Sequence, residues 1–122
     1  MNEYLNNMNN PLLKQNCSAL NGSEHLLSAK QCGSQLALLI DWQITEHGKA
    51  LQKTVRFDNY YQTMAFVNAL AFIAHHEDHH PDLSVHYNRC EIRFSTHDVG
   101  GLSINDFICA AKTDALLSNQ FI

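Results

Sequence analysis

The sequence predicts an α+β fold in which a four-stranded antiparallel sheet has three helices packed on one face. Two observations lead to this prediction. Apolar residues recur at helical spacing in two segments, a third segment opens with a capping box, and two pairs of short strand-like segments lie between them. A turn joins the members of each pair, which is typical of a β-hairpin. The predicted order is α-β-β-α-β-β-α, and hairpins placed between helices favour an antiparallel sheet.

The first and third helices are marked by residues that cap helix ends. Ser28 and Gln31 have the spacing of a capping box, and they open a segment that runs to about residue 39. Gly33 weakens this helix. Ser103 can cap the third helix, with Asp106 in its first turn. One face of that helix is apolar: Ile104, Phe107, Ile108, Ala111 and Ala115.

The second helix has signals at both ends. Asp58 or Asn59 can cap its beginning. Pro81 disfavours helical backbone at His80, so the helix should end near Asp78 or His79. Its apolar stripe is predicted to be core: Phe66, Val67, Leu70, Ile73 and Ala74.

The strands fall in two hairpins. Residues 42–57 form the first, with a turn at His47-Gly48 and an apolar face of Leu51, Val55 and Phe57. The second turns at Asn88-Arg89, and its apolar positions alternate on both sides: Leu83, Val85 and Tyr87, then Cys90, Ile92 and Phe94. Gly100-Gly101 then breaks the chain before the last helix.

The bulk composition describes one small globular domain. The chain has 122 residues, with 45% hydrophobic and 16% charged residues. We expect residues 1–22, rich in Asn, to form a loosely ordered arm and residues 23–122 to form a single domain. The net charge of −4 argues against binding nucleic acid or an anionic membrane.

The expected location is the cytoplasm. The four cysteines have no C-x-x-C pairing, so reduced thiols are favoured over structural zinc or a disulfide framework. The N-terminus lacks the pattern of a secretory signal. No segment approaches 18 consecutive apolar residues, so no membrane span is expected.

The segment HHEDHHPDL, residues 75–83, is the strongest chemical signal. Six of the eight histidines lie between residues 75 and 97. His75 and His79 are four apart and could share a helix face with a third ligand from His80, His86 or His97, which would suit zinc. The helix is expected to end near His79, so His75 and His79 would not share a helix face. The zinc-binding motif H-E-x-x-H is also absent. A solvated helix end without function is a second alternative.

Acid–base chemistry is the interpretation that the cluster favours most. Histidine, with an ordinary pKa of ~6.5, can both donate and accept a proton near neutrality. Adjacent histidines that leave a helix point in different directions, and His97 follows the last strand. A reaction that needs one proton delivered and another removed would suit this arrangement, although these features alone do not identify the substrate.

The spacing of these residues resembles the pterin-4a-carbinolamine dehydratase family. His79-His80-Pro81 is followed after five residues by Tyr87, and after nine more by His97 in Ser95-Thr96-His97. Gly101-Leu102-Ser103 and Asp106 complete the motif. The resemblance extends from about residue 28 to 118 and includes Trp42, Phe57-Asp-Asn-Tyr, Ala65-Phe-Val-Asn and the segment from Asn105 to Asp114, which is similar to bacterial members.

The resemblance implies both a fold and a reaction. The family fold, a four-stranded antiparallel sheet with three helices on one face, agrees with the element order above. The implied substrate is a tetrahydropterin with a hydroxyl on C4a, produced when an aromatic amino acid hydroxylase uses its cofactor. Loss of water gives quinonoid dihydropterin, which a reductase recycles. No metal and no cofactor is implied, and the chain is expected to associate with itself as a dimer or tetramer.

The resemblance also implies roles for individual residues. His79 and His97 would be the catalytic acid–base groups, and His80 would chiefly hold the pterin. Asp106 would orient a histidine, or else be a simple charge at a helix N-terminus. The other positions expected to contact substrate are Pro81, Ser95, Thr96 and His75.

His75 departs from the family, which usually has an acid four residues before the first motif histidine. Glu77 and Asp78 lie close by in the sequence and are candidates to replace it. Two other functions compete with pterin dehydration. Some animal relatives bind a homeodomain transcription factor, which implies a non-catalytic dimerisation or coregulator module, although three histidines at this spacing argue against binding alone. A metal-dependent hydrolase is the third candidate.

Overall fold

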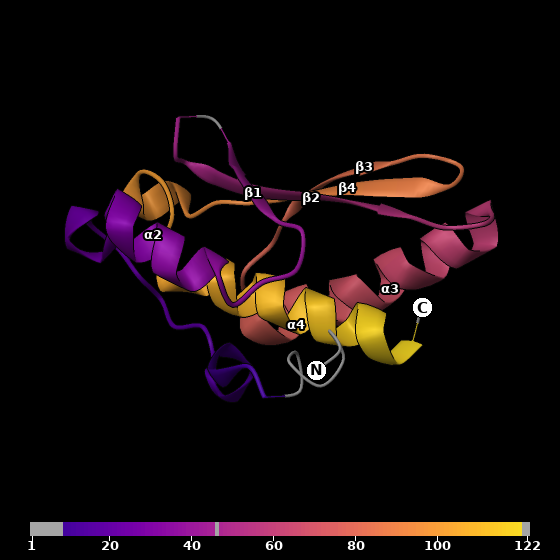
Figure 1. The fold of residues 1–122 in the computed structure, drawn as a ribbon, viewed down its shortest axis with the longest axis horizontal. Helices are drawn as coiled ribbons and strands as arrows, with labels where there is room; N and C mark the ends of the chain where they lie inside the picture. Colours follow the sequence, from indigo (N-terminus) through magenta and orange to yellow (C-terminus); the bar gives the residue numbers. More distant parts are fainter. Residues whose placement is uncertain (1–8, 46, 121–122) are drawn as a thin grey trace.

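The computed structural model describes residues 9–45 and 47–120, and the side chains of all of these except 119 and 120. Three α-helices, α2 (Ala29–Leu36), α3 (Tyr60–Glu77) and α4 (Ile104–Gln120), alternate with two hairpins. The hairpins contain β1 (Gln43–Thr45) with β2 (Ala50–Arg56), and β3 (Asp82–Val85) with β4 (Arg89–Phe94). Figure 1 shows the sheet as one layer with the helices beneath it. The predicted α+β fold and its element order are confirmed.

The sheet has the strand order β1-β2-β4-β3, with all neighbours antiparallel. Strand β4 lies at its centre, and Cys90, Ile92 and Phe94 alternate into the core while the residues between them face outward. On β2 the inward series is Leu51, Lys53 and Val55. Lys53 is tolerated there because its ammonium lies 2.8 Å from the buried carboxylate of Asp114.

The caps expected from the sequence set the helix boundaries. Ser28 and Gln31 form the capping box of α2, and Asn59 rather than Asp58 caps α3. Helix α3 ends at Asp78, which has a left-handed φ of 51°, before Pro81. At the start of α4 the carboxylate of Asp106 accepts the backbone N–H of Ser103 at 3.0 Å. The Ser103 hydroxyl, expected to be the cap, lies 2.7 Å from Thr96 Oγ1.

The part of the N-terminal arm that the structure describes is held by specific contacts. Leu12, in a 3-10 helix (Pro11–Lys14), is only 1% exposed and belongs to the hydrophobic core. The Cys17 N–H donates to Glu77 at 2.7 Å, and Ser18 and Asn105 exchange two hydrogen bonds. The described part of the arm, residues 9–22, is therefore attached to α3 and α4 by contacts that its Asn-rich composition does not indicate. Residues 1–8 lie outside the described residues.

Two further expectations concern cysteines and membranes. All four cysteines are free thiols, as expected, although Cys17 Sγ lies 3.5 Å from Cys109 Sγ. In the part of the chain that the structure describes, no helix is long and apolar enough to cross a membrane.

Candidate active site

His79 is placed by the way α3 ends. Asp78 takes the left-handed conformation, and the N–H of His79 then donates back to the carbonyl of Ala74 at 3.1 Å. This is the 6→1 bond of a Schellman motif, which fixes the chain direction at a helix C-terminus. The imidazole of His79 is consequently turned inward, where it stacks on Phe94 with 6.0 Å between ring centroids and an interplanar angle of 8°.

Asp106 holds this imidazole from the first turn of α4. His79 Nε2 lies 2.6 Å from Asp106 Oδ1, and the two side chains are 11% and 0% exposed. The other carboxylate oxygen, Oδ2, accepts the Thr96 hydroxyl at 2.8 Å and the Ser103 N–H at 3.0 Å. With Asp106 ionised, its carboxylate only accepts hydrogen bonds, which assigns the N–H of the His79 ring to Nε2 as the hydrogen-bond donor to Oδ1. The predicted pairing of Asp106 with a histidine is thus present.

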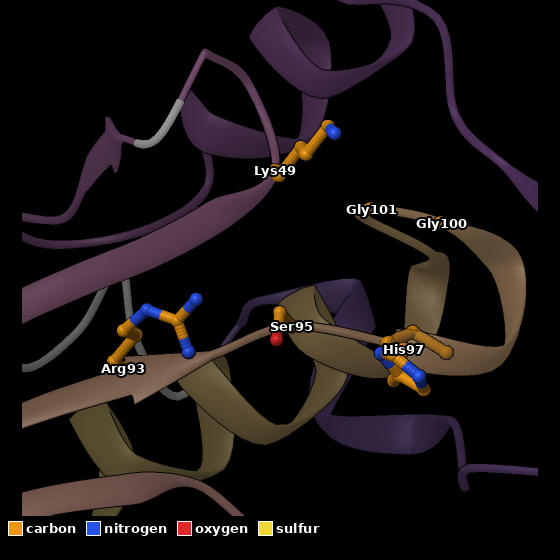
Figure 2. Close-up of a pocket in the computed structure, with 7 residues that line it drawn as sticks. Lys49, Arg93, Ser95, His97, Gly100 and Gly101 are labelled. Carbon is orange, nitrogen blue, oxygen red and sulfur yellow. The ribbon is translucent and has the colours of Figure 1, made fainter.

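His97 directly follows Thr96, at the beginning of a 3-10 helix (His97–Val99). It is exposed and lines an open pocket of about 270 Å³ together with Ser95 and Thr96. Figure 2 shows Ser95 between Arg93 and His97 along the end of β4. Because side chains alternate along an extended chain, Arg93, Ser95 and His97 share one side, while Thr96 is buried and points to Asp106.

The structure therefore links most of the predicted residues but does not place all of them around one pocket. Hydrogen bonds connect His79 to Asp106 and Asp106 to Thr96. Thr96 also lines the pocket of His97. His80 is exposed and Pro81 half-buried, directly after His79. Within the described residues, none of His75, His79, His80 and Pro81 belongs to the lining of that pocket. The Thr96 hydroxyl, expected to meet substrate, donates to Asp106 instead.

Glu77, one of the two candidates to replace the acid that the resemblance implies at position 75, is engaged with other partners. Its side chain is 2% exposed, lies 3.1 Å from the Lys112 ammonium and accepts the Cys17 N–H. Burial works to raise the pKa of Glu77, but the Cys17 N–H and Lys112 outweigh it and hold this pKa below its usual value. His75 itself is exposed on α3. Glu77 thus anchors the arm and α4 to α3.

Sequence reasoning missed four residues of the pocket lining: Lys49, Arg93, Gly100 and Gly101. The strand alternation could have found Arg93, because it is two residues before Ser95 on the same side. Lys49 comes from the first hairpin and approaches only through the pairing of β2 with β4. The two glycines are brought to the pocket by the bridge between Thr96 and Gly101, in which the Thr96 N–H donates to the Gly101 carbonyl at 2.8 Å.

The histidines suggested as zinc ligands do not converge on one point. Among residues 9–45 and 47–120, no group of three or more His, Cys, Asp or Glu side chains is arranged to hold a metal ion. His75 and His79, the pair proposed from spacing, separate at the helix end, and His79 turns to Asp106. That catalysis needs no metal remains a prediction, which chelation tests.

Comparisons with known proteins agree with the motif spacing. The family model described as pterin 4 alpha carbinolamine dehydratase matches residues 25–116. A protein from Stenotrophomonas maltophilia named as a pterin-4-alpha-carbinolamine dehydratase is 61% identical over 106 residues, which is 87% of this chain and 91% of the relative. One of the same name from Xanthomonas axonopodis is 57% identical over 106 residues, with 87% and 90% covered.

Two solved structures are also similar. A transcriptional coactivator/pterin dehydratase from Brucella melitensis has a TM-score of 0.71 at 27% identity, covering 74% of this chain and 96% of that one. A pterin dehydratase-like protein described as a RuBisCO assembly factor in the alpha-carboxysome has a TM-score of 0.55 at 27% identity, covering 63% and 89%.

Proposed function

The chain belongs to the pterin-4a-carbinolamine dehydratase family, and we propose that it dehydrates 4a-hydroxytetrahydropterin by histidine acid–base catalysis. The product is quinonoid dihydropterin, and the reaction recycles the pterin cofactor of an aromatic amino acid hydroxylase, in the cytoplasm. The observation that carries this proposal is the buried contact of 2.6 Å between His79 and Asp106 beside the pocket of His97.

The reaction needs two proton transfers at neighbouring atoms. The hydroxyl on C4a must leave as water, which requires a proton, and N5 must lose its proton as the C4a=N5 bond forms. Each transfer that a positioned group assists is typically worth ~10²–10⁴-fold in rate. Two histidines that approach the substrate from different directions can divide these tasks.

His79 is suited to this work because its tautomer is set. Nε2 is occupied by Asp106, so Nδ1 is the nitrogen that exchanges a proton with substrate. Asp106 stabilises the imidazolium that forms when Nδ1 takes a proton. His97, exposed at the pocket, performs the second transfer. We assign no order to the two roles, since both groups can donate or accept.

His80, Pro81, Ser95, Thr96 and His75 are proposed to position the pterin. His80 is exposed next to His79, so His80→Ala should raise KM more than it lowers kcat, as expected when ground-state binding is lost. Because Glu77 is engaged with Lys112, His75→Glu would restore an acid that Glu77 does not supply. We expect this variant to keep or raise kcat/KM, and a large loss would show that imidazole itself is needed here.

A direct test is dehydration of chemically prepared 4a-carbinolamine, followed by absorbance. Purified protein should accelerate the reaction above its uncatalysed rate, and equally well after exhaustive chelation. A rate equal to the uncatalysed one would contradict the proposed reaction. Loss of activity on chelation with recovery on adding zinc would contradict only the metal-free mechanism.

A binding role is the second candidate, because one structural relative is described as a transcriptional coactivator as well as a pterin dehydratase. Two aromatic side chains on α3, Tyr61 and Phe72, are 83% and 72% exposed and could meet a protein partner. Replacing both by Ser should leave dehydration intact. If the unmodified protein shows no dehydration at all, the binding role becomes the favoured one.

A further inference from the structure

A second cavity lies beside the pocket of His97 and differs from it in chemistry. Its volume is about 310 Å³. Four apolar residues from two parts of the chain contribute to its lining: Leu26, Leu27, Ala29 and Ile44. The pocket of His97, by contrast, is lined mainly by polar and charged side chains.

The two cavities share part of their walls. Lys49, Gly100 and Gly101 line both of them, and Figure 2 shows the two glycines on the loop that faces Lys49. A Cβ added to Gly101 would lie 2.9 Å from Leu26 Cδ1, which is closer than real Cβ contacts allow. Gly100 and Gly101 thus form a wall between the two cavities that has no side chains, called the glycine partition below. Leu26 packs directly against this wall on the side of the apolar cavity.

The proposed reaction places a constraint on any group that enters this region. The reacting atoms of the substrate are C4a and N5, so a histidine in contact with them sits at that edge of the pterin. C6 is bonded to N5. A substituent on C6 is therefore attached to an atom two bonds from the reacting carbon C4a. It must leave the pocket close to the catalytic histidine. The glycine partition lies three to four residues after His97 in the chain.

We propose that the apolar cavity beside Gly100-Gly101 receives the C6 substituent of the pterin and selects for its length. This inference rests on the proposed function, with His97 at the C4a–N5 edge. The occupant is an alkyl or hydroxyalkyl chain of a few carbons, which passes over the glycines and contacts Leu26, Ala29 and Ile44. Leu26 is 44% exposed, so a ligand can cover it further.

The expected effect follows from burial of apolar surface. Each methylene moved from water into an apolar site improves affinity about fourfold, which corresponds to ~0.8 kcal/mol. The cavity is partly open, so we expect KM to fall about two- to fourfold for each carbon added from a 6-methyl to a 6-propyl substrate. The rate of the chemical step should change little, because the added contact is equal in ground and transition states.

The experiment measures kcat and KM for 6-methyl, 6-ethyl and 6-propyl carbinolamines with three proteins. In Leu26→Asp the decrease of KM with chain length should disappear. Ala29→Phe, which fills the cavity, should reverse it, so that KM rises with length. Leu38→Asp is the matched control, since Leu38 is 39% exposed and does not line the cavity, and it should behave like the unmodified protein. Circular dichroism checks that each variant is folded.

Binding of the corresponding 6-alkyl 7,8-dihydropterins, measured by calorimetry, separates this inference from the proposed reaction. If turnover is absent but affinity still rises with chain length and loses that trend in Leu26→Asp, the subsite stands and the dehydratase proposal fails. A KM and an affinity that are independent of chain length in the unmodified protein would overturn the subsite. So would an unchanged trend in both Leu26→Asp and Ala29→Phe.

Discussion

Asp106 is the residue on which the geometry of His79 depends. Its carboxylate accepts from three donors: His79, Thr96 and Ser103. In Asp106→Asn the amide has one accepting atom in place of two, so its NH₂ group would face a donor. We expect kcat to fall roughly 10–10²-fold, part of the ~10²–10⁴-fold that a positioned acid–base group supplies, with a smaller change in KM.

The control for this prediction is Asp98→Asn, an exposed acid near His97. A purely structural role of Asp106 would lower thermal stability while the pH profile of kcat for the remaining folded enzyme kept its shape. An altered profile in Asp106→Asn with an unaltered one in Asp98→Asn supports the orienting role. Identical profiles in all three proteins would contradict it.

Glu77 gives a prediction about stability and pH. Its pKa is lower in the folded protein than in the unfolded chain, so its ionised form stabilises the fold above the unfolded value of ~4.3. That contribution is lost as the pH falls through the folded value. Glu77→Gln should lower the free energy of unfolding at pH 7 by about 1–3 kcal/mol. Urea unfolding should show the difference shrinking below about pH 4.3, and a constant difference would contradict it.

For single residues, the sequence predicted which side chains have useful chemistry better than it predicted which side chains they contact. Asp106 was predicted to orient a histidine because the motif spacing suggested it, and the contact is present. Glu77 was a candidate to replace the acid at position 75 because it lies two residues away in the sequence. The direction of a side chain at a helix end depends on the backbone geometry of that end. Glu77 lies on the buried face of α3, where its carboxylate contacts Lys112.

The attachment of the N-terminal arm belongs to the scale of elements. Leu12 is 1% exposed in the core, so Leu12→Ala should lower the free energy of unfolding by about 2–5 kcal/mol, the usual cost of removing a buried leucine. Thermal unfolding with Leu38→Ala as the exposed control would measure it. Equal stability of the two variants would show that the arm contributes nothing to the core.

Capping and periodicity explain why the elements themselves were predictable. The Ser28 box, the Asn59 cap and the alternation of β4 are local signals, readable within a few residues. The arm lacks such a signal. Its contacts pair Cys17 with Glu77, 60 residues away, and Ser18 with Asn105, 87 residues away, which no local pattern encodes.

The exposed edge strand β3 leads to a prediction about self-association of the whole molecule. In the described part of the chain β3 pairs with β4 alone, and its residues are all exposed, including Leu83 at 37% and Val85 at 39%. An uncovered strand edge favours pairing with a second copy. Sedimentation at micromolar concentration should show a dimer or tetramer, and Val85→Lys should weaken it. A fully active monomer would contradict this prediction.

The most direct test of the account is the kcat for carbinolamine dehydration by His79→Ala and His97→Ala beside the unmodified protein. Each variant should retain its fold and lose roughly 10–10³-fold in kcat, since each removes one proton-transfer group. His76→Ala, an exposed histidine outside the site, should keep the full rate. Unchanged kcat in both site variants would contradict histidine acid–base catalysis by this chain.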